Sequence, residues 1–137
     1  MTGKSRKLSN LKEIEGKTSP HQEQVSRALK LRSDALAFVA DVEGLAEFMG
    51  GKVEELGLKE DWAVSKEIYP GIIVYFLFNR ADEEFPAALR VFFSGDRLSL
   101  ISGEDLAGFT INFVSHMLRY VRETNEGKQL PEVCYRV

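Results

Sequence analysis

The chain has 137 residues, of which 44% are hydrophobic and 28% are charged, a composition typical of one soluble globular domain. The length excludes two full-sized domains, and an aromatic content of 10% excludes a wholly disordered chain. The formal net charge is −3, but residues 1–19 carry +3 while the rest of the chain carries −6. Because an acidic body repels the phosphates of nucleic acid, we expect no nucleic-acid partner.

Residues 1–18 form a basic segment without apolar periodicity, and we expect this tail to be disordered. A single domain then occupies residues 19–137. Ser19 fits an N-cap, Pro20 the first position of a helix and Gln22 the third, a pattern typical of a capping box. Apolar residues recur at helical spacing from there to about Val42, and a break near Ser33 stays open.

A second, short helix is predicted over Leu45–Met49, because its apolar residues continue the helical pattern. The pair Gly50-Gly51 should end it, since two glycines cost about 2 kcal/mol of helix propensity. The next residues, Lys52–Lys59, fit either a helical turn or a short edge strand.

From Trp62 the apolar pattern changes to a period of two, which predicts strands. The sequence Pro70-Gly71 suits the central positions of a type II turn and joins the first two strands as a hairpin. Four strands are expected, over Trp62–Tyr69, Ile72–Phe78, Ala87–Phe93 and Arg97–Ile101.

Ser102 is expected to cap a long last helix, with Glu104 and Asp105 in its first turn, where the helix dipole favours negative charge. This helix should end near Asn125. The order of elements predicts an α+β fold with two N-terminal helices, a four-stranded antiparallel meander and one long C-terminal helix.

The predicted strand Ile72–Phe78 is apolar on both faces, so both faces of the sheet need a cover. Three alternatives stay open: the N-terminal helices and the last helix lie on opposite faces, a homodimer buries the second face, or a ligand cavity lies there. For a homodimer, we expect an interface on the last helix formed by Ile111, Val114, Leu118 and Val121. For a ligand, the expected lining of an apolar pocket between the sheet and the last helix is Phe76, Phe92, Phe109 and Phe113.

Two acidic groups, Asp82-Glu83-Glu84 and Glu104-Asp105, would have to gather at one end of the sheet to act as general acids and bases. Nothing in the pattern raises the pKa of a carboxyl, and Arg80 and Arg90 favour solvated ion pairs instead. An enzyme that uses these carboxylates stays an alternative. We expect no catalytic residue.

The two histidines, His21 and His116, lack the spacing of zinc ligands, and Cys134 is the only cysteine, so neither a disulfide within the chain nor a cysteine-rich metal site is expected. Cys134 and His116 would form a nucleophile and base only if the C-terminus folded back. The longest uninterrupted apolar run, Ile72–Phe78, is far shorter than the about twenty residues of a membrane helix. We therefore expect a cytoplasmic protein without metal or cofactor.

The sequence Asp82-Glu83-Glu84-Phe85-Pro86-Ala87, followed by Val91-Phe92-Phe93, Leu100 and Glu104-Asp105-Leu106-Ala107, resembles the domain of unknown function 3786 family. In this hexapeptide we expect Phe85 to enter the core and Pro86 to begin a strand. The resemblance spans Asp82 to Ala107 and implies a prokaryotic protein, without naming a reaction or a catalytic residue.

These observations favour a noncatalytic binding or protein-interaction module that is a homodimer, because apolar surface exceeds the need of one small sheet while no residue set fits a known reaction. The alternative is a protein that binds a small apolar ligand or cofactor in the phenylalanine pocket.

Overall fold

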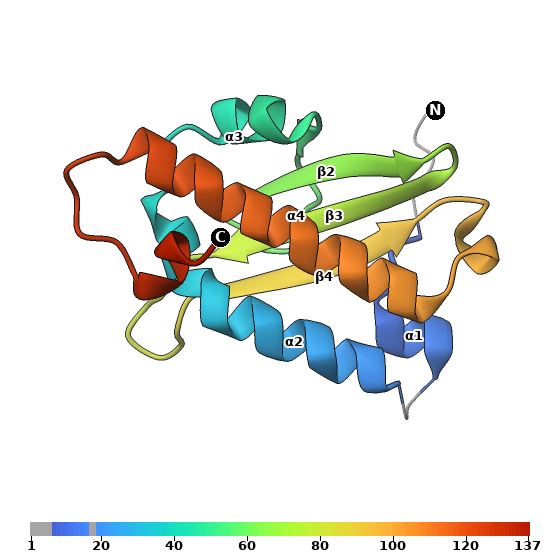
Figure 1. Cartoon of the computed structure of the whole chain (residues 1–137). Coiled ribbons are helices and arrows are strands. Elements are labelled where there is room, and N and C mark those ends of the chain that lie inside the picture. The colour runs from blue at the N-terminus through green and yellow to red at the C-terminus, as the bar shows by residue number, and fades with distance from the viewer. Residues whose placement is uncertain (1–6, 17–18) are drawn as a thin grey trace.

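The computed structural model describes residues 7–16 and 19–137 (Figure 1). The chain forms four antiparallel strands in the order β1-β2-β3-β4, with helices before and after them, which confirms the predicted α+β class. The strands are β1 (Lys52–Glu54), β2 (Trp62–Tyr69), β3 (Ile72–Asn79) and β4 (Ala88–Ser94). The helices are α1 (Leu11–Glu15), α2 (Pro20–Arg32), α3 (Val42–Met49) and α4 (Gly103–Thr124), with 3₁₀ turns at Ser33–Phe38, Leu98–Leu100 and Glu132–Tyr135.

Helix α2 begins where the sequence predicts, because the Ser19 hydroxyl accepts the backbone N–H of Gln22 at 3.1 Å. It ends at Arg32 and does not continue to Val42, so the break near Ser33 that the sequence left open is present. The Ser33 hydroxyl donates to the Leu29 carbonyl at 2.6 Å, and the chain tightens there into a 3₁₀ turn. Helix α3 begins at Val42, before the predicted Leu45, because the Asp41 carboxylate caps it by accepting the Gly44 backbone N–H at 3.0 Å. It ends as predicted at Gly50, whose φ of 75° is left-handed.

The hairpin between β2 and β3 confirms the predicted turn at Pro70-Gly71. Gly71 has a φ of 84°, as the third residue of a type II turn requires, and Tyr69 pairs with Ile72 on either side of it. Along the hairpin, Val64 lies opposite Phe76, and both side chains are fully buried.

The fourth strand differs from the prediction. Arg97–Ile101 does not extend the sheet, and β1 supplies the fourth strand by pairing with β2, Val53 opposite Val64. A strand after β4 would need the outer edge of β4 near Phe93, but Phe93 exchanges both of its backbone hydrogen bonds with Ser9, at 2.9 and 2.7 Å. The N-terminal segment therefore occupies the outer edge of β4 at Phe93.

The described part of the N-terminal segment is ordered, so the predicted disordered tail is wrong for residues 7–16. Leu8 packs on one face of the sheet, Ser9 pairs at the edge of β4, and Leu11 enters the core with 1% of its surface exposed. Asn10 and Glu13 form a capping box that starts α1. We call Leu8–Glu15 the N-terminal strap. Residues 1–6 and 17–18 of the predicted tail lie outside the described residues.

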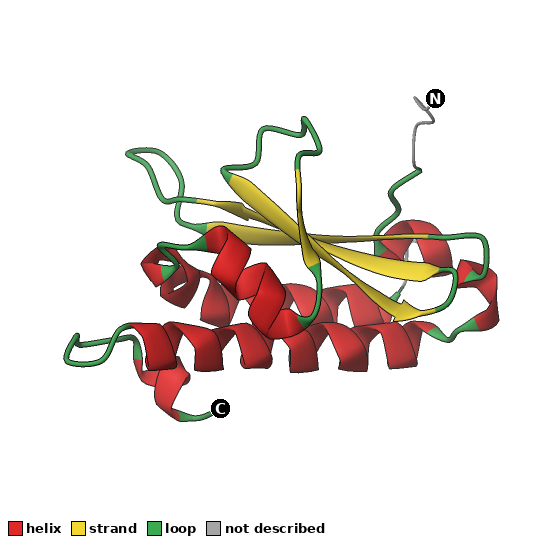
Figure 2. Ribbon diagram, turned by 90° about the horizontal axis from the view of Figure 1, so that it is seen from above, coloured by secondary structure: helices red, strands yellow, loops and turns green. Residues whose placement is uncertain are grey.

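All the helices lie on the same face of the sheet, as Figure 2 shows. One core cluster joins Leu29 of α2, Leu45 of α3, Phe76 of β3 and Leu118 of α4. Of the three alternatives for covering the sheet, the one with the N-terminal helices and the last helix on opposite faces is therefore wrong. The second face carries a smaller cluster, in which Ala63, Tyr75 and Leu77 are buried and Leu8, Leu56, Ile73 and Phe92 pack beside them.

Candidate functional site

The outer edge of β4 offers backbone groups that the described part of the chain leaves unpaired. Because both backbone groups of Phe93 point outward to Ser9, the groups of Val91 and Leu89 also point outward by the two-residue period of a strand. No hydrogen bond of the described residues reaches these groups. The other sheet edge differs, since β1 has only three residues and carries the exposed Lys52.

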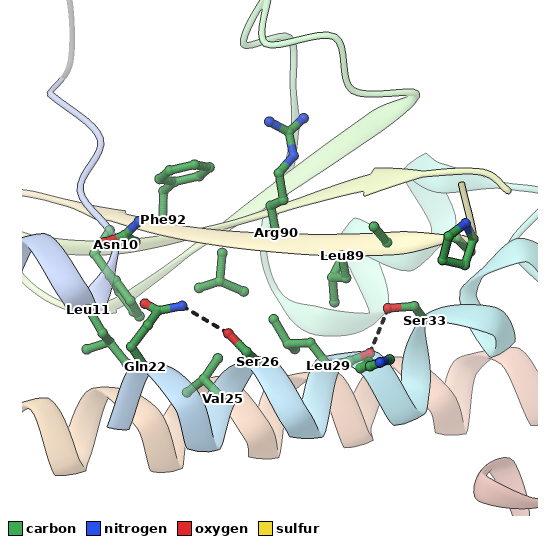
Figure 3. A pocket seen from close by; sticks show the side chains of 16 residues that line it. Asn10, Leu11, Gln22, Val25, Ser26, Leu29, Ser33, Leu89, Arg90 and Phe92 are labelled. Carbon is green, nitrogen blue, oxygen red and sulfur yellow. Dashed lines mark hydrogen bonds between the residues drawn. The ribbon is translucent and has the colours of Figure 1, made fainter. Parts of the chain in front are cut away.

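Helix α2 runs beside this edge and forms the second wall of a groove (Figure 3). Residues of α2 at helical spacing line it, with Val25 and Leu29 as the apolar wall and Ser26 at the rim. The groove has a volume of about 400 Å³. On the strand side it is lined by Leu89, whose side chain points toward α2, and by Val91.

One end of the groove is closed by the N-terminal strap. Ser9 occupies the edge at Phe93, and Asn10 and Leu11 line the groove next to it. On the α2 side of this end, the Gln22 amide donates to the Ser26 hydroxyl at 3.1 Å and accepts the Lys12 backbone N–H at 3.3 Å. A ligand along β4 must therefore begin or end before Phe93.

The other end of the groove leads to the turn before β4. The Asp82 carboxylate accepts the backbone N–H groups of Phe85 and Glu84 at 2.7 and 2.8 Å, and these bonds hold the pKa of Asp82 below its usual range. This turn leaves Phe85 67% exposed, so the expectation that Phe85 enters the core is wrong. Pro86 lines the groove just before the strand begins.

Arg90 and Phe92 extend the site to the far side of the strand. Figure 3 shows both side chains pointing away from α2, opposite in direction to Leu89. The Arg90 guanidinium donates through Nη2 to the Leu58 carbonyl at 2.8 Å and to Asn79 Oδ1 at 3.2 Å. Asn79 belongs to β3, the inner neighbour of β4, and Leu58 to the segment before β2, so these two neutral acceptors hold the guanidinium toward β3.

The predicted acidic groups do not form a catalytic site. Asp82-Glu83-Glu84 precedes β4 and Glu104-Asp105 follows it, so they lie at opposite ends of that strand (Figure 1). The lowered pKa of Asp82 is also the reverse of what a general acid needs. The described residues contain no group of three side chains that could hold a metal ion.

The other candidate chemical groups have structural contacts of their own. The Glu15 carboxylate accepts the Ser19 hydroxyl and lies 2.9 Å from His21 Nδ1. His116 stacks on Phe48 with ring centroids 4.5 Å apart. Cys134 is buried, which raises the pKa of its thiol, and the structure gives it no hydrogen bond to His116 among the described residues.

The predicted phenylalanine pocket does not exist as one cavity. Phe113 packs edge-on against Phe76 and stacks with Phe109, at centroid distances of 6.5 and 6.4 Å, so these rings fill the space between β3 and α4. Phe92 lies on the second face of the sheet. Three of the four rings therefore come together, but they pack against one another and do not line a common pocket.

The predicted interface on α4 is also wrong for three of its four residues. Val114, Leu118 and Val121 are fully buried within the single chain, and only Ile111 keeps part of its surface exposed. The homodimer stays a prediction, but its expected interface on α4 is not available. Within the described ranges, no helix is both long and apolar enough to cross a membrane.

The profile of a family described as Domain of unknown function (DUF3786) matches residues 7–116. The chain belongs to this family. The match confirms the resemblance and extends it well beyond Asp82–Ala107. It includes both walls of the groove and the N-terminal strap that closes it, so the candidate site lies wholly within the DUF3786 region. No curated protein and no solved structure matches the chain.

Val25 and Leu29 belong to the apolar pattern of the first predicted helix, and the structure buries both in the core cluster, so this pattern did not reveal the groove that they also line. The available signal was polar: Gln22, Ser26 and Lys30 recur on the same stripe of α2, which marks the rim of a surface site. That β4 is an edge strand could not be read from the sequence, since Arg97–Ile101 occupied that edge in the prediction.

Proposed function

We propose that this DUF3786 domain is a noncatalytic binding module that takes an extended polypeptide segment into the groove between α2 and β4. The observation that carries this proposal is the row of outward backbone groups at Leu89 and Val91 beside an apolar groove. An added strand would pair with these groups and bury apolar side chains against Val25 and Leu29.

The chemistry of the edge favours a polypeptide over a small apolar ligand. Alternating N–H and C=O groups at strand spacing are matched by another backbone, whereas an apolar molecule would cover them without hydrogen bonds. The bridge between Ser9 and Phe93 supports the same conclusion, because the chain's own N-terminal strap already pairs with this edge in antiparallel orientation.

The first test is selection of random heptapeptides displayed on phage, with the intact protein immobilised. In the free protein, we expect the amides of Leu89 and Val91 to exchange rapidly with solvent and those of Arg90 and Phe92, which face β3, to exchange slowly. A selected peptide should slow exchange at Leu89 and Val91. Protection confined to another surface would overturn the proposal.

The matched variants are Val91→Pro and Val91→Ala. Val91→Pro removes the outward N–H without touching the ladder to β3, because the backbone groups of Val91 face away from that strand. Val91→Ala shortens the side chain and keeps the N–H. We expect Val91→Pro to weaken peptide binding about tenfold relative to Val91→Ala, as measured by fluorescence anisotropy. Equal affinities would show that the edge does not pair with the peptide.

A second copy of the chain is the competing occupant of this edge, since two β4 edges are able to pair about a two-fold axis. Sedimentation equilibrium separates the two cases. If the amides of Leu89 and Val91 became more protected from exchange as the protein concentration rose, in step with dimer formation, the edge would belong to the homodimer. That result would overturn the peptide proposal.

A further inference from the structure

Resting on the proposed function, we infer that the groove selects peptides with an acidic side chain between two aliphatic ones. Two observations carry this inference: the side chains of β4 alternate between the two faces of the sheet, and Arg90 is the charged residue of that strand, with Lys30 of α2 as the other cation that lines the groove. This preference concerns three consecutive peptide residues, which lie opposite Val91, Arg90 and Leu89.

The two outer peptide residues face the apolar groove. In an antiparallel pair, directly opposite residues project to the same face of the sheet. The peptide residues opposite Val91 and Leu89 therefore point toward α2, as Leu89 itself does. There they meet Val25 and Leu29 in a groove of about 400 Å³. Aliphatic side chains of β-branched type suit this space, since they fit both an extended backbone and a narrow apolar wall.

The middle peptide residue points the other way, to the side where Arg90 and Phe92 project. Its direct neighbour across the new pair is Arg90. The bonds to the Leu58 carbonyl and to Asn79 of β3 order the Arg90 guanidinium but hold it toward β3, so a long acidic side chain such as Glu is needed to reach across β4 to its remaining N–H groups.

The positive charge of Arg90 has no carboxylate partner within the part of the chain that the structure describes. The acidic residues around Arg90 are engaged elsewhere: Asp61 accepts the Arg80 backbone N–H at 2.6 Å, and Asp82 accepts the N–H groups of its own turn. Glu60 accepts the backbone N–H groups of Leu56 and Leu58 at 2.6 and 2.8 Å. A carboxylate on the peptide would supply the missing partner through Nη1 or Nε of Arg90, because Nη2 already donates to Leu58 and Asn79.

The experiment compares three fluorescein-labelled heptapeptides, Ser-Thr-Val-Xaa-Val-Thr-Ser, in which the middle residue Xaa is Glu, Gln or Lys. We expect the intact protein to bind the Glu peptide about fivefold more tightly than the Gln peptide, and the Lys peptide most weakly, with a preference that fades at high salt. The Arg90→Glu variant should reverse the order of the Glu and Lys peptides. Arg119→Glu, an exposed change of the same charge on α4, should leave the order unchanged.

The outcomes separate this inference from the function on which it rests. If all three peptides bind equally and still slow amide exchange at Leu89 and Val91, the edge binds peptides and the acidic preference is overturned. If neither these peptides nor the phage library yields binding at β4, the proposed function itself fails. Should Arg90→Glu not fold, Arg90→Gln provides the same test, because it should abolish the difference between the Glu and Gln peptides.

Discussion

Phe85 is held outside the core by the turn that carries it. The Asp82 side chain accepts two backbone N–H groups of this turn, and the Asp82 N–H donates to the Phe85 carbonyl at 2.9 Å. These bonds fix the backbone and leave the ring two-thirds exposed. In the sequence, an aromatic residue before a strand looks like an anchor in the core; here the local turn decides its direction.

Truncation of two aromatic residues should have very different effects on stability. We expect Phe85→Ser to change the free energy of unfolding by less than about 0.5 kcal/mol, because the ring buries little surface. Phe76→Ala should lower the free energy of unfolding by about 3–5 kcal/mol, because Phe76 of β3 is fully buried and packs against Phe113 of α4. Urea denaturation measures both values. A large loss for Phe85→Ser would mean that the ring packs on the protein in solution.

Glu15 connects the end of α1 to the start of α2. The hydrogen bond from the Ser19 hydroxyl, aided by His21, lowers the pKa of the Glu15 carboxyl despite the opposing effect of burial. A carboxyl whose pKa is lowered in the folded state contributes stability above its unfolded pKa. That contribution is lost as the pH falls through the acidic range, below about 4.3.

Glu15→Gln should therefore lower the free energy of unfolding at neutral pH by about 1 kcal/mol, with a smaller effect at about pH 3, because the contribution of the ionised carboxyl is lost as the pH falls. Denaturation at the two pH values measures the difference. The control is Glu123→Gln, a change at an exposed position of α4. Glu13→Gln is not a suitable control, because Glu13 completes the capping box of α1. An equal effect of Glu15→Gln at both pH values would show that the ionised form is not what stabilises the strap.

At the scale of elements, α4 shows why an unusually wide apolar surface need not form an interface between molecules. Helix α4 contacts α1, α2, α3 and the C-terminal 3₁₀ turn, besides covering the sheet. Neighbours on several sides bury residues that a helix lying on a sheet alone would expose. The apolar pattern of a helix shows how many of its residues need a cover, but it does not show how many neighbouring elements of the same chain provide that cover.

Leu118 tests this account of α4. Because Leu118 is fully buried in the single chain, Leu118→Ala should cost about 2–5 kcal/mol, and Leu118→Glu should unfold the protein. Circular dichroism and sedimentation velocity check the result together. If the Leu118→Glu protein stayed folded and only dissociated from a dimer to a monomer, the result would support the interface that the sequence predicted.

At the scale of the whole molecule, the sequence predicts what is local and misses what joins distant segments. The hairpin at Pro70-Gly71 and the caps at Ser19 and Ser102 depend on a few adjacent residues, and the structure confirms them. The bridge from Ser9 to Phe93 depends on two segments far apart in the chain. That single pairing displaces the expected fourth strand and, with α2, creates the groove, so the candidate site could not be predicted before the sheet was known.

The groove has a thermodynamic consequence of its own. Its two walls and its closed end come from β4, α2 and the N-terminal strap, and so it exists only when all three are assembled. An occupant that binds this assembly and not the unfolded chain shifts the folding equilibrium of the entire domain, by about 2.7 kcal/mol at a hundredfold excess over its dissociation constant. In a cell, the lifetime of the protein would then follow the supply of such an occupant.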